Sequence, residues 1–370
     1  MLFPDNARFG FALTDLAEAL HSIPMTTQQP LPCDRYIARS CLQKAIRRGE
    51  VVLAQRALAN LFEHDPATVW RHLVIICLED VGIANVGLLA QIIAARQDRR
   101  WRAQLGGDWQ VLAGLVRLMA ESVHCQAACD LLLRVMNDPA FDQDRADALE
   151  AEPSSLAETV GNPTEKIELR AIAAMAMGGC LAEGQLNKDP CGLFDVMAEH
   201  GQFSSVVAAC RAAWKISRNP MAMLLPLIWE AWMKDDRHHI ADDTLPAAQM
   251  MRGVPGYALD QFTRVGNTIS RAFLRECDEL RSVFEVAGVS SADFSSTLGD
   301  LIFLLEGGLV RRRCHWSLGD ELRLPHRQLP AVARLGSNLE LSARLVQAKA
   351  SQIATLRTQY LGLRFPAVAL

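Results

Sequence analysis

Two adjacent carboxylates, Glu79 and Asp80, follow a largely apolar run at 69–78 and lie just before a glycine. At the C-terminal end of a helix they face the negative end of the helix macrodipole, and their burial is costly unless a cation meets them. Such cations end an earlier helical segment, "KAIRR" at 44–48. The sequence therefore predicts an ionic latch between two helices, formed by Lys44, Arg47, Arg48, Glu79 and Asp80.

The same carboxylates could instead bind a metal ion or act as an acid and base. Either role needs a histidine or a third carboxylate close by. Histidines occur beside carboxylates at 237–243 and beside cysteines at 124–129, but neither spacing matches a specific ligand signature. We interpret the first segment as a polar loop and the second as buried helix, and we expect no metal, no cofactor and no catalytic residue.

Arginines flank a tryptophan in two short segments, "RQDRRWR" at 96–102 and "VRRRCHW" at 310–316. Arginine supplies charge for phosphate, and tryptophan supplies a stacking surface for an unpaired base. The alternative is a solvated helix end whose tryptophan folds back into the core. The residues predicted to contact nucleic acid are Arg96, Arg99, Arg100, Trp101, Arg102, Arg311, Arg312, Arg313 and Trp316.

The segment "YALDQFTRVGN" at 257–267 is the best candidate for a polar binding surface. At helical spacing Tyr257, Asp260 and Arg264 share one face. The alternative is an ordinary Asp260–Arg264 pair on a helix, which contributes only a few tenths of a kcal/mol.

The composition limits what the chain can be. It has 370 residues, of which 50% are hydrophobic, and a net charge of −4, so it can bury the core of two or three domains but cannot coat nucleic acid as a polycation. Its 10 cysteines form no CxxC pair, which favours a reducing cytosol. The N-terminus lacks a basic secretory start, and the longest apolar stretch, at 221–233, is too short to cross a bilayer. We expect a soluble protein of the cytoplasm.

Helix start and stop signals repeat along the chain with little strand alternation. Asp34 can cap a helix that stops at Gly49 and carries Tyr36 on its apolar face, while Asp65 and Pro66 can start another. Short turns predict an all-α fold of stacked antiparallel helix pairs. Helices are expected at 35–48, 50–62, 67–79, 85–96, 108–121, 124–137, 165–179, 201–217 and 221–233.

Three further segments complete the organisation. Residues 138–164 are acidic and bounded by prolines, which predicts an exposed loop with at most a short helix. Residues 300–318 favour a helix stopped by Gly307 and Gly308 and then an extended segment, although two short strands around a Gly-Gly turn are the alternative. Residues 337–360 predict one long helix whose apolar stripe favours self-association.

Residues 40–85 resemble the C-terminal helical domain of the replication-associated recombination protein A family, bacterial AAA+ ATPases related to the Werner-helicase-interacting protein. The shared pattern is a basic "KAIRRG" turn, an alanine-rich helix, a "WRHL" helix and the "EDVGIA" ending, with a weaker likeness at 253–267. The resemblance implies an oligomerising, clamp-loader-collar-like domain. Its implied organisation is an N-terminal segment at 1–33, the collar-like domain at 34–275 and a C-terminal helical extension at 276–370.

Members of that family carry an ATPase module before the helical domain. This chain contains no GxxxxGK[ST] phosphate loop, so ATP hydrolysis does not follow from the resemblance. Together with the arginine and tryptophan segments, it predicts a non-catalytic module linked to DNA replication or recombination that binds single-stranded or branched DNA as a homo-oligomer. The alternative is a scaffold or inhibitor that binds a protein partner and not DNA, which a salt titration of DNA binding would distinguish.

Overall fold

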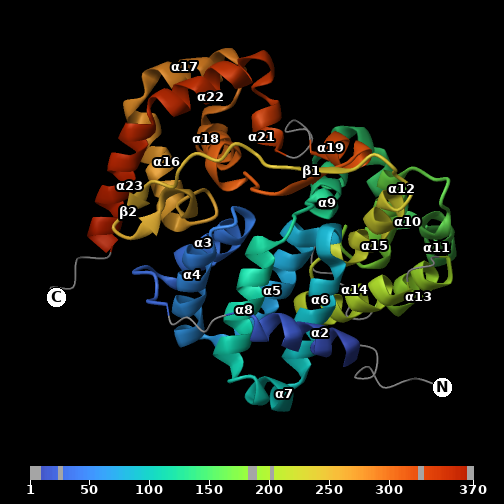
Figure 1. Cartoon of the computed structure of the whole chain (residues 1–370). Helices are drawn as coiled ribbons and strands as arrows, with labels where there is room; N and C mark the ends of the chain where they lie inside the picture. The colour runs from blue at the N-terminus through green and yellow to red at the C-terminus, as the bar shows by residue number, and fades with distance from the viewer. Residues whose placement is uncertain (1–9, 24–27, 182–189, 201–203, 324–328, 365–370) are drawn as a thin grey trace.

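Helices form most of the regular structure in this computed structural model, which describes residues 10–23, 28–181, 190–200, 204–323 and 329–364 (Figure 1). Within these ranges the strands form two short antiparallel pairs. The predicted all-α fold class is therefore confirmed at the level of helix content. The domain boundaries and the collar-like arrangement stay predictions.

Most of the helices up to residue 232 follow one another after only a few residues. Their bounds are α2 (Gly10–His21), α3 (Arg35–Arg47), α4 (Val51–His64), α5 (Pro66–Ile76), α6 (Val86–Gln97), α7 (Arg99–Gln104), α8 (Asp108–Glu121), α9 (Ala127–Asn137), α10 (Asp142–Glu150), α11 (Pro153–Gly161), α12 (Ile167–Met177), α13 (Cys191–His200), α14 (Ser204–Ser217) and α15 (Met221–Trp232).

The remaining chain carries the strands and the C-terminal helices. The strands are β1 (His239–Ala241), β2 (Met250–Met251), β3 (Val254–Pro255) and β4 (Arg313–His315). The helices are α16 (Arg264–Glu276), α17 (Asp278–Val286), α18 (Phe294–Ile302), α19 (Ser317–Leu322), α21 (Pro330–Ala333), α22 (Leu339–Ala348) and α23 (Ala350–Arg364). Figure 1 shows α16, α17, α18, α22 and α23 gathered on one side, with α19 apart from them beside α9.

Two aspartates start helices as predicted. Asp34 accepts hydrogen bonds from the backbone N–H groups of Tyr36 and Ile37, both at 2.9 Å, and so caps α3. Asp65 accepts from the backbone N–H of Thr68 at 3.1 Å and caps α5. Each cap satisfies N–H groups that the first turn leaves unpaired, and it places a carboxylate at the positive end of the helix dipole.

The predicted loop at 138–164 is wrong, because the segment folds into α10 and α11. Pro153 occupies the first turn of α11, where proline fits without losing a hydrogen bond. Leu156 and Val160, one turn apart, are buried in the core. Two apolar residues at helical spacing were therefore enough to anchor a segment that is otherwise acidic.

The C-terminal part follows the predictions in part. The helix α18 continues into a π-helix, η6 (Phe303–Gly307), and an extended segment with β4 follows, as predicted for 300–318. The single helix predicted at 337–360 is wrong, since Lys349 separates α22 from α23. Ile353 and Leu356 of the predicted apolar stripe are buried within the chain, at 3% and 7% exposure. They are therefore covered without a second copy, and self-association stays a prediction.

The longest apolar helical run is Pro66–Gln97 and not the 221–233 segment. By length and composition alone this run could cross a membrane. Most of its apolar window is buried, and Gly82 interrupts it with a φ of +54°. Both features are typical of helices that pack inside a protein core.

Candidate functional site

Asp80 is the centre of a buried polar cluster at the end of α5. Residues 77–81 form a π-helix, η1 (Cys77–Val81), and the Asp80 side chain has no exposed surface. Arg47 Nε donates to Asp80 Oδ1 at 2.6 Å, Gln126 Nε2 donates to the same oxygen at 2.9 Å, and Gln43 Nε2 donates to Oδ2 at 3.1 Å. These donors offset the desolvation of the carboxylate. The Arg47–Asp80 part of the ionic latch is therefore present.

Two other cations of the latch bind elsewhere. Lys44 Nζ lies 2.7 Å from Asp260 Oδ2, and Arg48 Nε lies 3.0 Å from Glu50 Oε1. Arg48 also donates to the backbone carbonyl of Glu306 at 3.1 Å. Their assignment to the latch was wrong, because Lys44 and Arg48 pair with Asp260 and Glu50 and not with the carboxylates at 79–80. The end of α3 consequently holds several distant segments.

Glu79 was also predicted in the latch, but its partners are amides and not cations. Asn219 Nδ2 donates to Glu79 Oε1 at 3.4 Å, and Gln43 Nε2 donates to Oε2. Burial, and then the neighbouring charge of Asp80, raise the pKa of Glu79 to about 7. The protonated side chain is therefore well populated in the folded protein at neutral pH.

We expect Glu79→Gln to stabilise the protein at alkaline pH. A carboxyl whose folded pKa is raised contributes stability that is fully present below its unfolded pKa and is lost as the pH rises through the folded value. For Glu79 this window runs from the ordinary value of 4.5 to about 7. The free energy of unfolding, measured with urea between about pH 5 and pH 8, should favour the variant by about 1–3 kcal/mol at the upper end only.

Glu340→Gln, on the exposed surface of α22, is the matched control. It should change stability little at any pH in this range. Equal curves for the wild type and Glu79→Gln would contradict the assigned titration of Glu79.

The first predicted DNA-binding segment lies on α7 and the end of α6, and only some of its side chains are exposed. Arg96, Arg99 and Arg100 are exposed, but Trp101 is half-buried and packs against the core. Arg102 is buried, donates to the carbonyl of Ala95 at 2.7 Å and pairs with Asp108 at 2.7 Å. Its prediction as a DNA contact was wrong, because the guanidinium closes the C-terminal end of α6.

The second predicted segment lies on and around β4. Arg311 and Arg312 are exposed, whereas Arg313 is 5% exposed and Trp316 is 2% exposed. Arg313 pairs with Asp243 at 2.9 Å. Arg313 and Trp316 were wrongly predicted as DNA contacts, because Arg313 pairs with Asp243 in the interior and Trp316 packs in the core.

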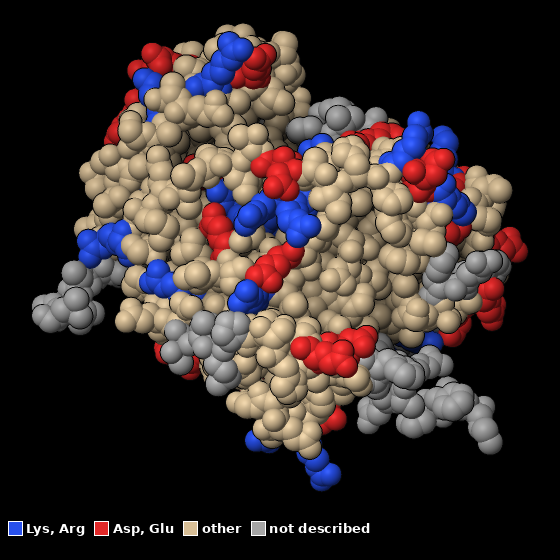
Figure 2. All heavy atoms as spheres, in the orientation of Figure 1, with Lys and Arg blue, Asp and Glu red and all other residues tan. Residues whose placement is uncertain are grey.

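The exposed arginines of the two segments do not form one surface. Figure 1 shows α7 at the lower edge of the molecule and β1, the partner of β4, in the upper half beside α9 and α19. Figure 2 shows basic and acidic side chains interleaved on this face, without one continuous basic area. The exposed residues stay predictions as DNA contacts, namely Arg96, Arg99, Arg100, Arg311 and Arg312.

The prediction that residues 257–267 form a polar surface is also wrong. Tyr257 and Asp260 are each 3% exposed, and they precede α16 instead of sharing a helical face with Arg264. The Tyr257 hydroxyl donates to Glu50, and Asp260 pairs with Lys44. Of the three predicted residues only Arg264 is exposed.

A different surface gathers exposed arginines around an exposed aromatic ring. Tyr36 is 50% exposed, although we predicted it on the apolar face of α3. Arg35 lies 5.0 Å from the centre of its ring and donates to its hydroxyl at 3.1 Å. This hydrogen bond and the charges of Arg35, Arg264 and Arg39 lower the pKa of Tyr36. We call Arg35, Tyr36, Arg39, Arg71 and Arg264 the Tyr36 face.

The carboxylates beside the Tyr36 face are Asp34 and Asp65, and both are engaged in capping helices. A second exposed aromatic, Phe262, is 67% exposed and lies 5.5 Å from Lys44 Nζ. Tyr36 and Lys44 are two turns apart on α3, so their backbone positions are separated by about 12 Å along the helix axis. The sequence signal for this surface was "DRYIAR" directly after a helix cap, which places two arginines and a tyrosine within one turn.

A cavity of about 200 Å³ opens beside Tyr36 between the first turns of α3 and α5. The Arg39 guanidinium makes no hydrogen bond or ion pair with the described part of the chain. Burial lowers the pKa of Arg39, and the positive charges of Arg35 and Arg71 lower it further. His72 Nε2 is buried without a hydrogen-bond partner there. The cavity is lined by Arg35, Tyr36, Arg39, Leu61, His64, Asp65, Thr68, Val69 and His72.

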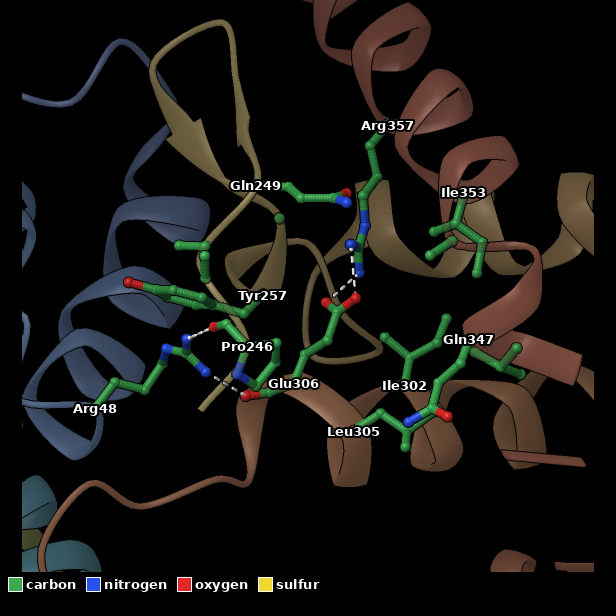
Figure 3. Close-up of a pocket in the computed structure, with 15 residues that line it drawn as sticks. Arg48, Pro246, Gln249, Tyr257, Ile302, Leu305, Glu306, Gln347, Ile353 and Arg357 are labelled. Carbon is green, nitrogen blue, oxygen red and sulfur yellow. Dashed lines mark hydrogen bonds and ion pairs between the residues drawn. The ribbon is translucent and has the colours of Figure 1, made fainter. Parts of the chain in front are cut away.

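A second cavity, of about 180 Å³, lies where the end of α3 meets the C-terminal helices (Figure 3). Glu306 and Arg357 point toward each other there and form two hydrogen bonds of 3.1 and 2.8 Å. Arg48 lies 4.7 Å from the centre of the Tyr257 ring on one side, and Ile353 lies on the other. Because its charges are already paired, this cavity suits a neutral and mainly apolar group.

No group of three or more histidine, cysteine or carboxylate side chains with metal-binding geometry occurs among the described residues. The segment predicted as a polar loop, 237–243, contains β1, in which His239 stacks on His315 with ring centres 5.0 Å apart. His124 and Cys125, considered above as zinc ligands, are buried.

Comparisons with protein-family models, with curated proteins and with solved structures found no match for this chain. The resemblance to the replication-associated recombination protein A family therefore stays a prediction, and the arrangement of the described side chains carries the functional argument.

Proposed function

We propose that this chain is a non-catalytic helical module, collar-like in arrangement, that binds single-stranded DNA without ATP hydrolysis. The observation that carries the proposal is the Tyr36 face, where the charges of Arg35, Arg39 and Arg264 act on a half-exposed tyrosine and the neighbouring carboxylates cap helices. Arginines in this setting contact phosphates, and the ring offers a surface on which one base stacks. The resemblance at 40–85 supports a role near DNA.

The aromatic rings favour single strands over duplexes. A base must leave its neighbours in the duplex before it can stack on a side chain, whereas an unpaired base is free to do so. Phe262, whose ring lies beside Lys44 two turns further along α3, offers an exposed ring for another base of the same strand. The chain is acidic overall, so the attraction to phosphate must come from this local cluster.

We expect Tyr36→Ala to weaken single-strand binding by about 5- to 150-fold, because base stacking on an aromatic side chain contributes about 1–3 kcal/mol. Changing Arg35, Arg39 and Arg264 together to Gln should weaken both single-strand and duplex binding. It should also flatten the salt dependence by about one unit of slope for each phosphate that the variant no longer neutralises. Fluorescence anisotropy of labelled strands over a salt series measures both effects.

The control variant changes Arg99 and Arg100 to Gln on α7. It removes two positive charges, but neither residue lines the cavity beside Tyr36 or acts on the Tyr36 ring, so affinity should fall little. A larger loss in this control than in the Tyr36-face variants would move the site back to the segment predicted from the sequence. Absence of any DNA binding at low salt would overturn the proposal.

The cavity in Figure 3 favours a second candidate function, a scaffold that binds a protein partner and not DNA. Its apolar wall and internally paired charges suit an apolar side chain of such a partner. This second function replaces the first if no DNA binds.

A further inference from the structure

The cavity beside Tyr36 has a cationic wall. Arg35 and Arg39 lie one turn apart on α3 and both line the cavity. Arg71 lies close enough for its charge to act on Arg39. Among the lining residues the acid is Asp65, whose carboxylate already accepts from the backbone N–H and hydroxyl of Thr68. The wall therefore keeps an excess of positive charge after its internal pairs are made.

Two nitrogen groups at this cavity lack partners within the described residues. Arg39 has its whole guanidinium available, and a guanidinium presents donors in a fork that matches the oxygens of a phosphate. His72 Nε2 is buried and makes no hydrogen bond to those residues. A buried nitrogen without a partner is uncommon in native proteins, and a bound water or ligand is one frequent explanation.

The position of the cavity relates it to the proposed DNA site. Tyr36 lines the cavity and is also the exposed ring of the Tyr36 face. A nucleotide whose base stacks on this ring would bring its phosphate to Arg39. The N-terminal ends of α3 and α5 lie at the cavity and add positive potential, while the C-terminal end of α4, at Leu61 and His64, offsets part of it. A cavity of about 200 Å³ has room for a phosphate group.

We infer that this cavity binds the terminal phosphate of a nucleic-acid strand, so that the protein recognises strand ends; this inference rests on the proposed function. A terminal phosphate monoester carries between one and two negative charges at neutral pH, whereas each internal phosphodiester carries one. Its free oxygens can enter the cavity from one side, while an internal phosphate continues into chain on both sides. Both differences favour the strand end over internal positions.

The test compares the affinities of short oligothymidylates that end in a 5′-hydroxyl, a 5′-phosphate or a 3′-phosphate for the full chain. One phosphorylated end should bind about tenfold more tightly than the hydroxyl end, as expected for charge-assisted hydrogen bonds to a phosphate. The end that shows the gain identifies the strand polarity. Arg39→Gln should reduce this preference to within about twofold.

Arg264→Gln is the matched control, because Arg264 belongs to the Tyr36 face but does not line the cavity. It should weaken all strands by the same factor and keep the preference for the phosphorylated end. Circular dichroism of Arg39→Gln checks that the variant folds. Inorganic phosphate should also raise the melting temperature of the wild type more than that of Arg39→Gln, which tests the cavity without DNA.

Strands that bind equally well with and without terminal phosphate overturn the inference and leave the proposed function standing. If no strand binds, the proposed function falls instead, and the inference about strand ends falls with it. In that case an Arg39-dependent effect of inorganic phosphate still distinguishes an anion-binding cavity from none.

Discussion

Asp80→Ala is expected to lower the free energy of unfolding by about 3–5 kcal/mol, the usual cost of removing one partner of a buried ion pair. The substitution leaves Arg47, which is 5% exposed, without its carboxylate in the protein interior. Gln43 and Gln126 also lose an acceptor. Urea unfolding at neutral pH, followed by far-ultraviolet circular dichroism, measures the loss.

The control for this prediction is Glu340→Ala on α22. Glu340 pairs with Arg344 one helical turn away, and both side chains are largely exposed, at 76% and 73%. Exposed pairs of this kind contribute about 0.3–0.5 kcal/mol, so the control should change little. If Asp80→Ala costs no more than the control, the ion pair with Arg47 does not hold the α3 and α5 ends together.

Gly82→Ala is expected to cost about 3 kcal/mol or more, because two separate penalties add. Gly82 has φ and ψ of 54° and −138°, a conformation that residues with a side chain rarely adopt, and such strain costs about 1–3 kcal/mol. A Cβ atom at this position would also lie 2.1 Å from the backbone oxygen of Cys125. Overpacking against a fixed backbone costs about 1–3 kcal/mol further.

Gly288→Ala separates the two penalties. Gly288 also has a positive φ, of +75°, but a Cβ added there meets no atom within 4 Å. Only the conformational strain should remain, about 1 kcal/mol. Thermal unfolding monitored for both variants gives the comparison, and equal losses would show that the close approach to Cys125 is unimportant.

The helices were predictable where local signals determine them. Asp34 and Asp65 can cap a first turn without any tertiary contact, so their positions could be assigned from the sequence. The failure at 138–164 arose because Leu156 and Val160 anchor a helix only through the core that they meet. The π-helix at 77–81 has no sequence signature, and only the packing around Asp80 explains it.

The candidate site was harder to predict because it depends on which side chains are buried and which stay exposed. Arg102 and Arg313 have the same chemistry as exposed arginines, and the sequence does not tell which guanidinium turns inward to a carbonyl or a carboxylate. Helical periodicity placed Tyr36 on the apolar face of α3. Periodicity gives the direction of each side chain around the helix, but it does not tell how much of that face the neighbouring helices cover, and Tyr36 lies outside the covered part.

The basic end of α3 also imposes an order on folding during synthesis. Arg47 donates to the carbonyl of Gly307 at 2.8 Å, and Arg48 donates to the carbonyl of Glu306 at 3.1 Å, so both depend on a segment that the ribosome makes much later. Arg47 and Arg48 can meet Asp80 and Glu50 early, but while the chain emerges the Nη1 groups that later bind these carbonyls remain hydrated. Helices near the N-terminus can form early, but their junction with the rest of the molecule closes only after residue 307 has left the ribosomal tunnel.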